Sequence, residues 1–529
     1  MARCFRCSPD TVAETADGRL QGFFLDGIYA FHGVKYADAQ RFQPPVPSGS
    51  WEGVRDATNY GYICPVNSEP LPAAEILIPH RFWPANEHCQ YLNVWTPTLD
   101  SAALKPVIVW LHGGGFANGS AIEQVAYEGD ALAQFADAVV ITLNHRLNIL
   151  GFLDMSSFGE RYANSVNAGM ADIVEALHWI RRNIAAFGGD PQNVTLVGQS
   201  GGGGKISALL QIPAAAGLFH RAVIMSGIFE GKGLPTPDHR EVVLDVMREL
   251  GISCDEPEKL EKTPYPMLNW AYSKVALKLL RTEKKLINWG PVPNGWYLGD
   301  PMVTGFSEYA KTVPIIAGTV VSEFSMRPGI QGAERLFREE KISILERSFG
   351  EKAEDLARLF ESAYPGRDIL QLLKLDVGTR RATVRYAEEK VRVSSAPTYL
   401  YMFAPVFDVN GPRPAWHCSD IPFVFHNTAR VPSSNNPQFS DRLEEQIAGA
   451  LAAFARRGDP NHPGLIPWPA CGEGKTATMI FDSSCRIGND YDRKLIEELH
   501  AVTLPGDPAG YSAMLLEAVM KEQGSEWVY

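Results

Sequence analysis

The feature that most constrains the fold is a glycine-rich turn between a strand pattern and a helix pattern, at residues 193–210. Val194 to Val197 is a run of β-formers, and an apolar-periodic helix start follows the glycines. The turn, Gly198-Gln199-Ser200-Gly201-Gly202, matches the Gly-x-Ser-x-Gly pattern, which holds a serine on a sharp strand-to-helix turn. Neighbours without a Cβ let strand and helix approach closely. The pattern therefore predicts an exposed nucleophile at Ser200, in preference to an ordinary glycine-rich loop.

Length and charge limit what the chain can be. Its 529 residues can bury a large core, and no linker, repeat or low-complexity tract divides them. We therefore expect a single domain over residues 1–529. The 49 basic and 61 acidic residues give a net charge of −12 without long blocks, which argues against nucleic acid or an anionic membrane as a partner.

The N-terminus and the cysteines bear on location and metal binding. The first residues lack the apolar segment of a signal peptide, and no apolar run approaches the ~18 residues of a membrane span. Eight cysteines are too few for a disulfide scaffold in a chain of this length. Cys4 and Cys7 form an isolated C-x-x-C without a nearby histidine, so we expect no metal site. These features predict a cytoplasmic protein without a membrane segment.

Strand and helix patterns alternate along much of the chain, which indicates a largely parallel sheet covered on both faces. Strands are expected at residues 18–36 (a hairpin turning at Asp26-Gly27), 91–95, 106–111, 138–143, 194–197, 222–225, 313–321, 399–403 and 479–481. Helices are expected at about 169–187 and 441–457, and helix-rich segments at about 238–285 and 331–395. Residues 44–51 are expected to form an irregular surface segment.

A serine nucleophile needs a base, a group that orients the base, and an oxyanion site. His112-Gly-Gly-Gly-Phe116 has a glycine run of the kind that turns backbone N–H groups toward a substrate oxygen, although a tight turn after a strand is the plain alternative. The residues alone do not select the base among 12 histidines. Glu323 is favoured as the acid only because it follows an apolar strand.

Several ordered segments carry a resemblance to a known family. They are Phe31-His-Gly-Val-Lys-Tyr-Ala37, Arg41-Phe-Gln-Pro-Pro45, Glu87-His-Cys-Gln-Tyr-Leu-Asn-Val-Trp-Thr-Pro97, Val109-Trp-Leu-His-Gly-Gly-Gly-Phe116, Asn144-His-Arg-Leu-Asn-Ile-Leu-Gly-Phe152, Phe187-Gly-Gly-Asp-Pro-Gln-Asn-Val-Thr-Leu196, Ala415-Trp-His-Cys-Ser-Asp-Ile-Pro-Phe-Val-Phe425 and Phe454-Ala-Arg-Arg-Gly-Asp-Pro-Asn461. Over nearly its whole length the chain resembles the type-B carboxylesterases, the cholinesterase-like branch of the α/β-hydrolases.

The resemblance implies an α/β-hydrolase fold whose two helix-rich insertions wall a gorge, and hydrolysis of small or medium uncharged esters through an acyl-enzyme, without metal or cofactor. Its nucleophile, acid and base fall on Ser200, Glu323 and His417, in the order usual for this fold. The oxyanion donors fall on the backbone N–H groups of Gly114, Gly115 and Gly201. Ser226 matches a serine that supports the acid in relatives, and a hydroxyl that caps a strand end is an equal alternative.

Four residues depart from the family pattern or are unusual in it. Gln199 replaces a glutamate, which predicts poor selection of cationic, choline-like esters. Gly201 replaces an alanine and loosens the helix start. Phe324 follows Glu323 where relatives carry glycine. Lys205 is expected to be solvated or salt-bridged, because lysine is rarely buried unpaired.

Some alternatives stay open at the level of sequence. The same serine chemistry serves amides, carbamates and thioesters, and a non-catalytic esterase-like binding protein would instead predict a broken triad and a secretion signal. Cys64 and Cys89 match a disulfide of secreted relatives, and we expect free thiols here. Aromatic residues that could line the gorge or simply pack the core are Trp289, Trp296, Phe324 and Trp416.

Overall fold

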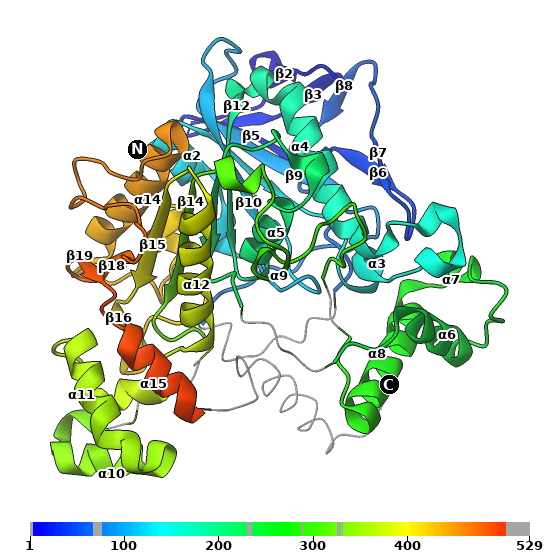
Figure 1. Cartoon of the computed structure of the whole chain (residues 1–529). Helices are drawn as coiled ribbons and strands as arrows, with labels where there is room; N and C mark the ends of the chain where they lie inside the picture. The colour runs from blue at the N-terminus through cyan, green and yellow to red at the C-terminus, as the bar shows by residue number, and fades with distance from the viewer. Residues whose placement is uncertain are drawn as a thin grey trace.

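The computed structural model describes residues 4–66, 77–229, 235–287, 290–324, 330 and 332–503. Its centre is a 12-stranded sheet (Figure 1). In spatial order the strands are β1 (Phe5–Arg6), β4 (Phe23–Leu25), β5 (Ile28–Lys35), β9 (Tyr91–Thr96), β11 (Val139–Leu143), β10 (Lys105–Leu111), β12 (Gly189–Gln199), β13 (Arg221–Met225), β14 (Ile315–Val320), β15 (Thr398–Phe403), β18 (Ala477–Phe481) and β19 (Arg486–Asn489).

The middle of the sheet is parallel and its margins are antiparallel. Every neighbouring pair from β11 across to β18 is parallel. The pairs that join β1, β4, β5 and β9 on one side, and β19 on the other, are antiparallel. The predicted mostly parallel sheet is therefore confirmed, and the predicted hairpin at Asp26-Gly27 joins β4 to β5.

Helices cover both faces of the sheet, because alternate residues of each central strand point to opposite sides. In β10, Ile108 and Trp110 join one buried cluster with α2 (Asp130–Ala136) and α14 (Ser440–Arg457). Val107 and Val109 join another with α4 (Ala168–Asn183), α5 (Gly201–Leu209) and α12 (Gly378–Val393). The continuous apolar strands read from the sequence are thus buried on both faces.

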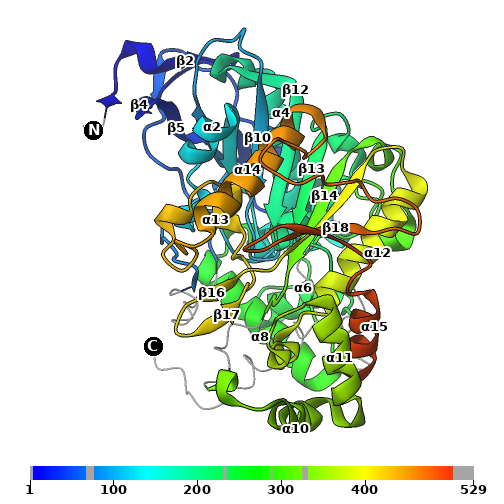
Figure 2. The same ribbon diagram turned by 90° about the vertical axis from the view of Figure 1, so that its left-hand side faces the viewer.

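The two predicted helix-rich segments are confirmed as helical. The first contains α6 (His239–Glu249), α7 (Lys259–Lys262) and α8 (Tyr265–Glu283); the second contains α10 (Arg338–Phe349), α11 (Ala353–Ala363) and α12. The helices α6 to α8 and α10 to α11 lie at the same end of the sheet, whereas α12 packs along β14 and β15 (Figures 1 and 2). Near the C-terminal end of the described chain, α15 (Arg493–Thr503) packs on α11.

Small ribbons complete the described fold. A three-stranded sheet joins β2 (Val12–Glu14), β3 (Arg19–Gln21) and β8 (Val54–Asp56), and β16 (Val406–Asp408) pairs with β17 (Pro412–Pro414). The expectation of a wholly irregular segment at residues 44–51 is wrong. Pro45–Pro47 forms β7, which pairs with β6 (Ala37–Ala39). Proline is tolerated in such a two-stranded ribbon because the ribbon has no second neighbour that needs its missing N–H.

Buried ion pairs fix the long loops around the sheet. Arg146 donates to Asp172, which lies on α4, at 2.7 Å. Arg380 on α12 donates to Asp492 at 2.9 Å. Cys64 and Cys89 are both buried free thiols. None of the helices in the described part of the chain has the length and apolar character that a bilayer crossing needs.

Candidate active site

The central turn has the predicted strand–turn–helix form. Ser200 lies between the end of β12 and the start of α5, with φ 56° and ψ −124°. Positive φ is strained for a residue with a side chain, and strain of this kind persists only where surrounding contacts impose it. Here the Ser200 N–H donates to the Met225 carbonyl at 2.8 Å, and the Gly204 N–H donates to the Ser200 carbonyl at 3.0 Å.

The glycines after Ser200 are explained by close packing of the first turn of α5. A Cβ at Gly202 would overlap the carbonyl oxygen of Leu111 at the end of β10. A Cβ at Gly203 would lie 2.9 Å from the Cα of Gly227, which follows β13. The helix therefore sits against two neighbouring strand ends at a distance that only glycine permits.

Glu323 and His417 form a hydrogen-bonded pair. Glu323 Oε2 lies 2.6 Å from His417 Nδ1, and Glu323 Oε1 accepts the Val320 N–H at 3.0 Å. The backbone N–H of His417 also donates to the backbone carbonyl of Glu323 at 2.7 Å. The Glu323 side chain is fully buried, whereas His417 keeps 12% of its side chain exposed. The Glu323 carboxylate is thus held in place by two bonds, and the imidazole of His417 reaches a more open space.

Gln199 lies against the His417 ring, close to both of its nitrogens. Gln199 Nε2 lies 3.2 Å from His417 Nε2 and 3.4 Å from His417 Nδ1, and the Cys418 thiol donates to Gln199 Oε1 at 3.3 Å. The Phe324 ring lies over the imidazole, with 4.6 Å between centroids. Within the described residues Ser200 Oγ makes no hydrogen bond to His417, and such bonds are often loose before substrate binds.

Two further carboxyl groups surround Glu323, and the sequence did not identify either as part of the site. Burial, together with the nearby Glu323 carboxylate, raises the pKa of Asp376 to about 7. Burial likewise raises the pKa of Asp420 to about 7, against the effect of a hydrogen bond from Tyr401 at 2.9 Å. Both groups therefore resist ionisation beside Glu323.

Ser226, the predicted support of the acid, is buried with φ 47° at the end of β13. Its N–H donates to the Gly318 carbonyl at 2.7 Å. Its Oγ has no hydrogen-bond partner among the described residues. The structure thus contains no bond from the Ser226 hydroxyl to Glu323.

The loop at residues 112–116, called the oxyanion loop below, follows β10 and lies against the turn at Ser200. A Cβ at Gly201 would stand 2.5 Å from the Cα of Gly115. Gly114 and Gly115 have φ of 82° and 62°, which glycine adopts without strain. No acceptor in the described part of the chain takes the N–H groups of Gly114, Gly115 or Gly201. These donors are therefore available to an external oxygen.

Lys205 is neither solvated nor salt-bridged, which corrects the expectation from the sequence. Its side chain is fully buried in α5, and Nζ donates to the His112 carbonyl at 2.8 Å. Burial lowers its pKa to about 7, opposed by Glu123. The stacked rings of His112 and His145 lie nearby, and burial followed by the charge of Lys205 lowers the pKa of each ring well below its usual range.

The aromatic residues proposed for a gorge differ in their surroundings. Trp416 is fully buried and packs on Phe407 with 5.1 Å between ring centroids, so it belongs to the core. Trp296 is partly buried against the α5 side of the sheet. Phe324 contacts the imidazole of His417. Trp289 lies outside the described residues.

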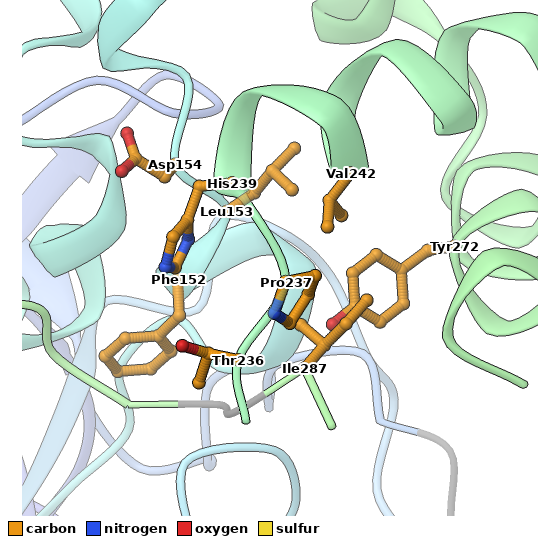
Figure 3. Close-up of a pocket in the computed structure, with 9 residues that line it drawn as sticks. All are labelled: Phe152, Leu153, Asp154, Thr236, Pro237, His239, Val242, Tyr272 and Ile287. Carbon is orange, nitrogen blue, oxygen red and sulfur yellow. The ribbon is translucent and has the colours of Figure 1, made fainter. Parts of the chain in front are cut away.

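Two cavities lie apart from the Glu323–His417 pair. The cavity in Figure 3 is bounded by α6, α8 and α3 (Asn148–Phe152), and it measures about 10 Å³, which leaves room for one water molecule and none for an ester. Its lining residues are Phe152, Leu153, Asp154, Thr236, Pro237, His239, Val242, Tyr272 and Ile287. An apolar cavity of about 40 Å³ lies beside Asp420. The described residues contain no cluster of His, Cys, Asp or Glu that could hold a metal ion.

A strained serine between a central parallel strand and a helix, at the sheet edge where Glu323 and His417 follow later strands, is the arrangement of the α/β-hydrolases. Comparison with known proteins specifies the class further. The chain belongs to the carboxylesterase family, whose sequence model matches residues 9–494. It is accordingly an ester hydrolase, and the serine mechanism is general for this family.

The similar proteins include two curated enzymes and one solved structure. Para-nitrobenzyl esterase of Bacillus subtilis (strain 168) is 32% identical, over 92% of this chain and 98% of that protein. Phenmedipham hydrolase of Pseudarthrobacter oxydans is 33% identical, over 91% and 97%. An esterase from anaerobic Clostridium hathewayi, described as able to hydrolyse aliphatic aromatic polyesters, is 44% identical with a TM-score of 0.92, over 95% and 100%.

Proposed function

We propose that Ser200 is the nucleophile of this esterase, His417 its general base and Glu323 the acid that orients His417. The observation that carries the proposal is the 2.6 Å bond between Glu323 Oε2 and His417 Nδ1, next to a serine held at φ 56°. That bond leaves Nε2 as the ring atom that can take a proton. The partial exposure of the His417 side chain supports the same assignment.

The reaction then runs in two transfers of one acyl group. His417 Nε2 takes the proton of Ser200 as Oγ attacks the ester carbonyl carbon, and the carbonyl oxygen becomes an oxyanion. The oxyanion collapses, the bond to the alcohol oxygen breaks, and His417 returns the proton to the leaving alcohol. Water, deprotonated by His417, attacks the acyl-enzyme; the bond from the acyl carbon to Ser200 Oγ then breaks, His417 returns the proton to Oγ, and the carboxylic acid leaves. The buried carboxylate of Glu323 stabilises the imidazolium in each half.

The oxyanion is bound by the backbone N–H groups of Gly114, Gly115 and Gly201. Support comes from their lack of acceptors within the described chain and from the close approach of Gly201 to Gly115. Donors fixed in this way need no rearrangement when charge develops, and removal of one oxyanion donor typically lowers kcat by about 10²–10³.

The substrates we propose are uncharged small or medium esters, with a preference for an aromatic group near His417. Gln199 supplies no negative charge for a cationic alcohol. The Phe324 ring covers the imidazole, and the Phe229 ring lies 6.4 Å from that of Phe324. The aromatic substrates in the names of two similar proteins agree with this preference.

The whole chain is proposed to be one catalytic unit in which the two helix-rich insertions wall the approach to Ser200. The family match over residues 9–494 supports the first point, and the shared position of α6 to α8 and α10 to α11 at one end of the sheet supports the second. A cytoplasmic location is proposed from the sequence, and the two free thiols of Cys64 and Cys89 are compatible with it.

Labelling with a fluorophosphonate probe tests the catalytic assignment. The protein should form a stable adduct that maps to Ser200 by mass spectrometry, and Ser200→Ala should abolish it. Ser207→Ala is the matched control, because Ser207 lies on the same helix and should leave labelling intact. Folded wild-type protein that stays unlabelled would refute the assignment.

A substrate panel tests the chemical class. We expect kcat/KM for neutral aryl esters to exceed that for choline esters, and for amides, carbamates and thioesters of the same acyl group. A clear preference for choline esters would contradict the argument from Gln199, and a preference for one of the other acyl derivatives would assign the same serine chemistry to that class.

A further inference from the structure

Lys205 connects the helix that begins after Ser200 to the oxyanion loop. Its Nζ donates to the His112 carbonyl at 2.8 Å, at the start of the loop. The same nitrogen lies 5.8 Å from the centroid of the Phe116 ring, at the end of the loop. One buried side chain therefore contacts both residues that flank Gly113–Gly115.

Three other carbonyl groups of the loop also have partners. His112 Nδ1 lies 2.9 Å from the Gly113 carbonyl, the Asn118 N–H donates to the Gly114 carbonyl at 2.9 Å, and the Asn148 N–H on α3 donates to the Phe116 carbonyl at 2.8 Å. These bonds shape the loop but do not connect it to the nucleophile. The bond from Lys205 does, because α5 begins at Gly201, directly after Ser200.

The chemistry of Lys205 is costly if its role is only to fill space. A buried amine loses hydration, whereas methionine would fill a similar volume without that loss. Burial lowers the Lys205 pKa to about 7, yet both the ammonium and the amine carry N–H groups that can donate to a carbonyl. The structural feature that needs a donor here is the His112 carbonyl.

We propose that Lys205 is a positioning residue for ester hydrolysis: its bond to the His112 carbonyl fixes the oxyanion loop relative to Ser200. The N–H groups of Gly114 and Gly115 are thereby held where the oxyanion forms. This inference rests on the proposed roles of Ser200, Gly114 and Gly115. Its effect is confined to the transition state, because the ground-state carbonyl makes weaker use of these donors.

The test compares Lys205→Met, which keeps the length of the side chain but removes the donor, with Lys205→Gln, which retains a neutral donor. Lys390→Met is the matched control. Lys390 is also a fully buried lysine, and its Nζ donates to the Val313 carbonyl at 3.1 Å. It lies on α12 and contacts neither the oxyanion loop nor the turn at Ser200. Each variant is assayed with a nitrophenyl ester and with a trifluoromethyl ketone that mimics the tetrahedral intermediate.

We expect Lys205→Met to lower kcat by about 10-fold to 100-fold, less than loss of an oxyanion donor itself, with KM changed less than about twofold. The inhibition constant of the ketone should rise by a similar factor, and Lys205→Gln should recover part of the loss. Lys390→Met should lower the melting temperature and leave kcat unchanged. A merely structural lysine would show the Lys390 pattern at both positions.

The inference is overturned if folded Lys205→Met keeps kcat within about twofold, or if its loss of rate is matched by Lys390→Met. It is also overturned if neither Lys205 variant yields folded protein, because the role is then structural. Wild-type labelling at Ser200 separates this result from failure of the proposed function: an unlabelled wild type refutes the catalytic assignment, whereas a labelled wild type with an unaffected Lys205→Met refutes only the role of Lys205.

Discussion

The side-chain amide nitrogen of Gln199 lies 3.2 Å from His417 Nε2 and 3.4 Å from His417 Nδ1, so it contacts the imidazole close to both ring nitrogens. The amide is neutral and contributes no negative charge beside the ring. A glutamate at this position would stabilise an imidazolium and would attract cations.

Gln199→Glu should change both the pH profile and the charge preference. The new carboxylate stabilises the protonated imidazole, so the acid limb of the kcat/KM profile should move to higher pH by about one unit. The ratio of kcat/KM for a choline ester to that for its neutral carbon isostere, with tert-butyl in place of trimethylammonium, should rise by about 10-fold. The isostere controls for shape. An unchanged ratio would show that Gln199 does not face the alcohol group.

Glu323→Gln should nearly abolish turnover without unfolding the protein. A neutral amide no longer stabilises the imidazolium and can orient His417 in the wrong tautomer, and in a serine protease the equivalent change lowers kcat by about 10⁴. Steady-state kinetics on a neutral ester would measure the loss.

Glu444→Gln is the matched control for Glu323→Gln. Glu444 is also buried and also accepts a backbone N–H, that of Thr428 at 2.7 Å, but it lies on α14. The control should retain kcat even where it lowers stability. A loss of kcat below about 10-fold in folded Glu323→Gln would exclude Glu323 as the acid.

Much of the fold was predictable because its signals are local. Apolar runs such as residues 106–111 and 138–143 specify buried strands, and the glycines around Ser200 specify the turn between strand and helix. The pairing of Glu323 with His417 is different. It joins residues separated by 94 positions, and only the family resemblance suggested it.

The environment of buried polar groups was not predictable from the sequence. Lysine is usually exposed to solvent, so the sequence alone predicts an exposed Lys205. Its partner, the His112 carbonyl, lies 93 residues away in the chain. Asp376 lies near Glu323 because its N–H donates to the Val321 carbonyl at 3.1 Å, and no local pattern reports that approach. The strand at Pro45–Pro47 was missed for the same reason, since its partner β6 supplies the pairing.

Gly201→Ala should impair catalysis although relatives carry alanine at the matching position. The new Cβ would stand 2.5 Å from the Gly115 Cα, so the oxyanion loop must move away from Ser200. We expect kcat to fall by about 10-fold or more, because displaced donors bind the oxyanion less well. The inhibition constant of a trifluoromethyl ketone would report the same change.

Gly204→Ala provides the matched comparison for Gly201→Ala, because it lies on the same helix. A Cβ there meets Phe116 and Gly227 only at ordinary van der Waals distances of 3.7 Å or more. The substitution should raise the free energy of unfolding by up to about 1 kcal/mol, since alanine favours a helix over glycine, with kcat unchanged. Equal losses of kcat in both variants would mean that helix flexibility, and not loop position, sets the rate.

Asp420→Asn should alter the pH dependence of stability in a defined direction. Burial raises the pKa of Asp420 from 3.8 to about 7, so the folded state holds this proton more firmly than the unfolded state. The stabilising contribution of Asp420 is therefore complete below about pH 4 and is lost as pH rises toward 7. The free energy of unfolding of wild type relative to Asp420→Asn should fall over this range, by up to about 4 kcal/mol, and then level off.

Urea unfolding at stepped pH values measures the difference. Asp408→Asn, at an exposed position on β16, should give a flat difference over the same range, and a flat difference for Asp420→Asn would refute the assignment of a buried, protonated carboxyl beside Tyr401.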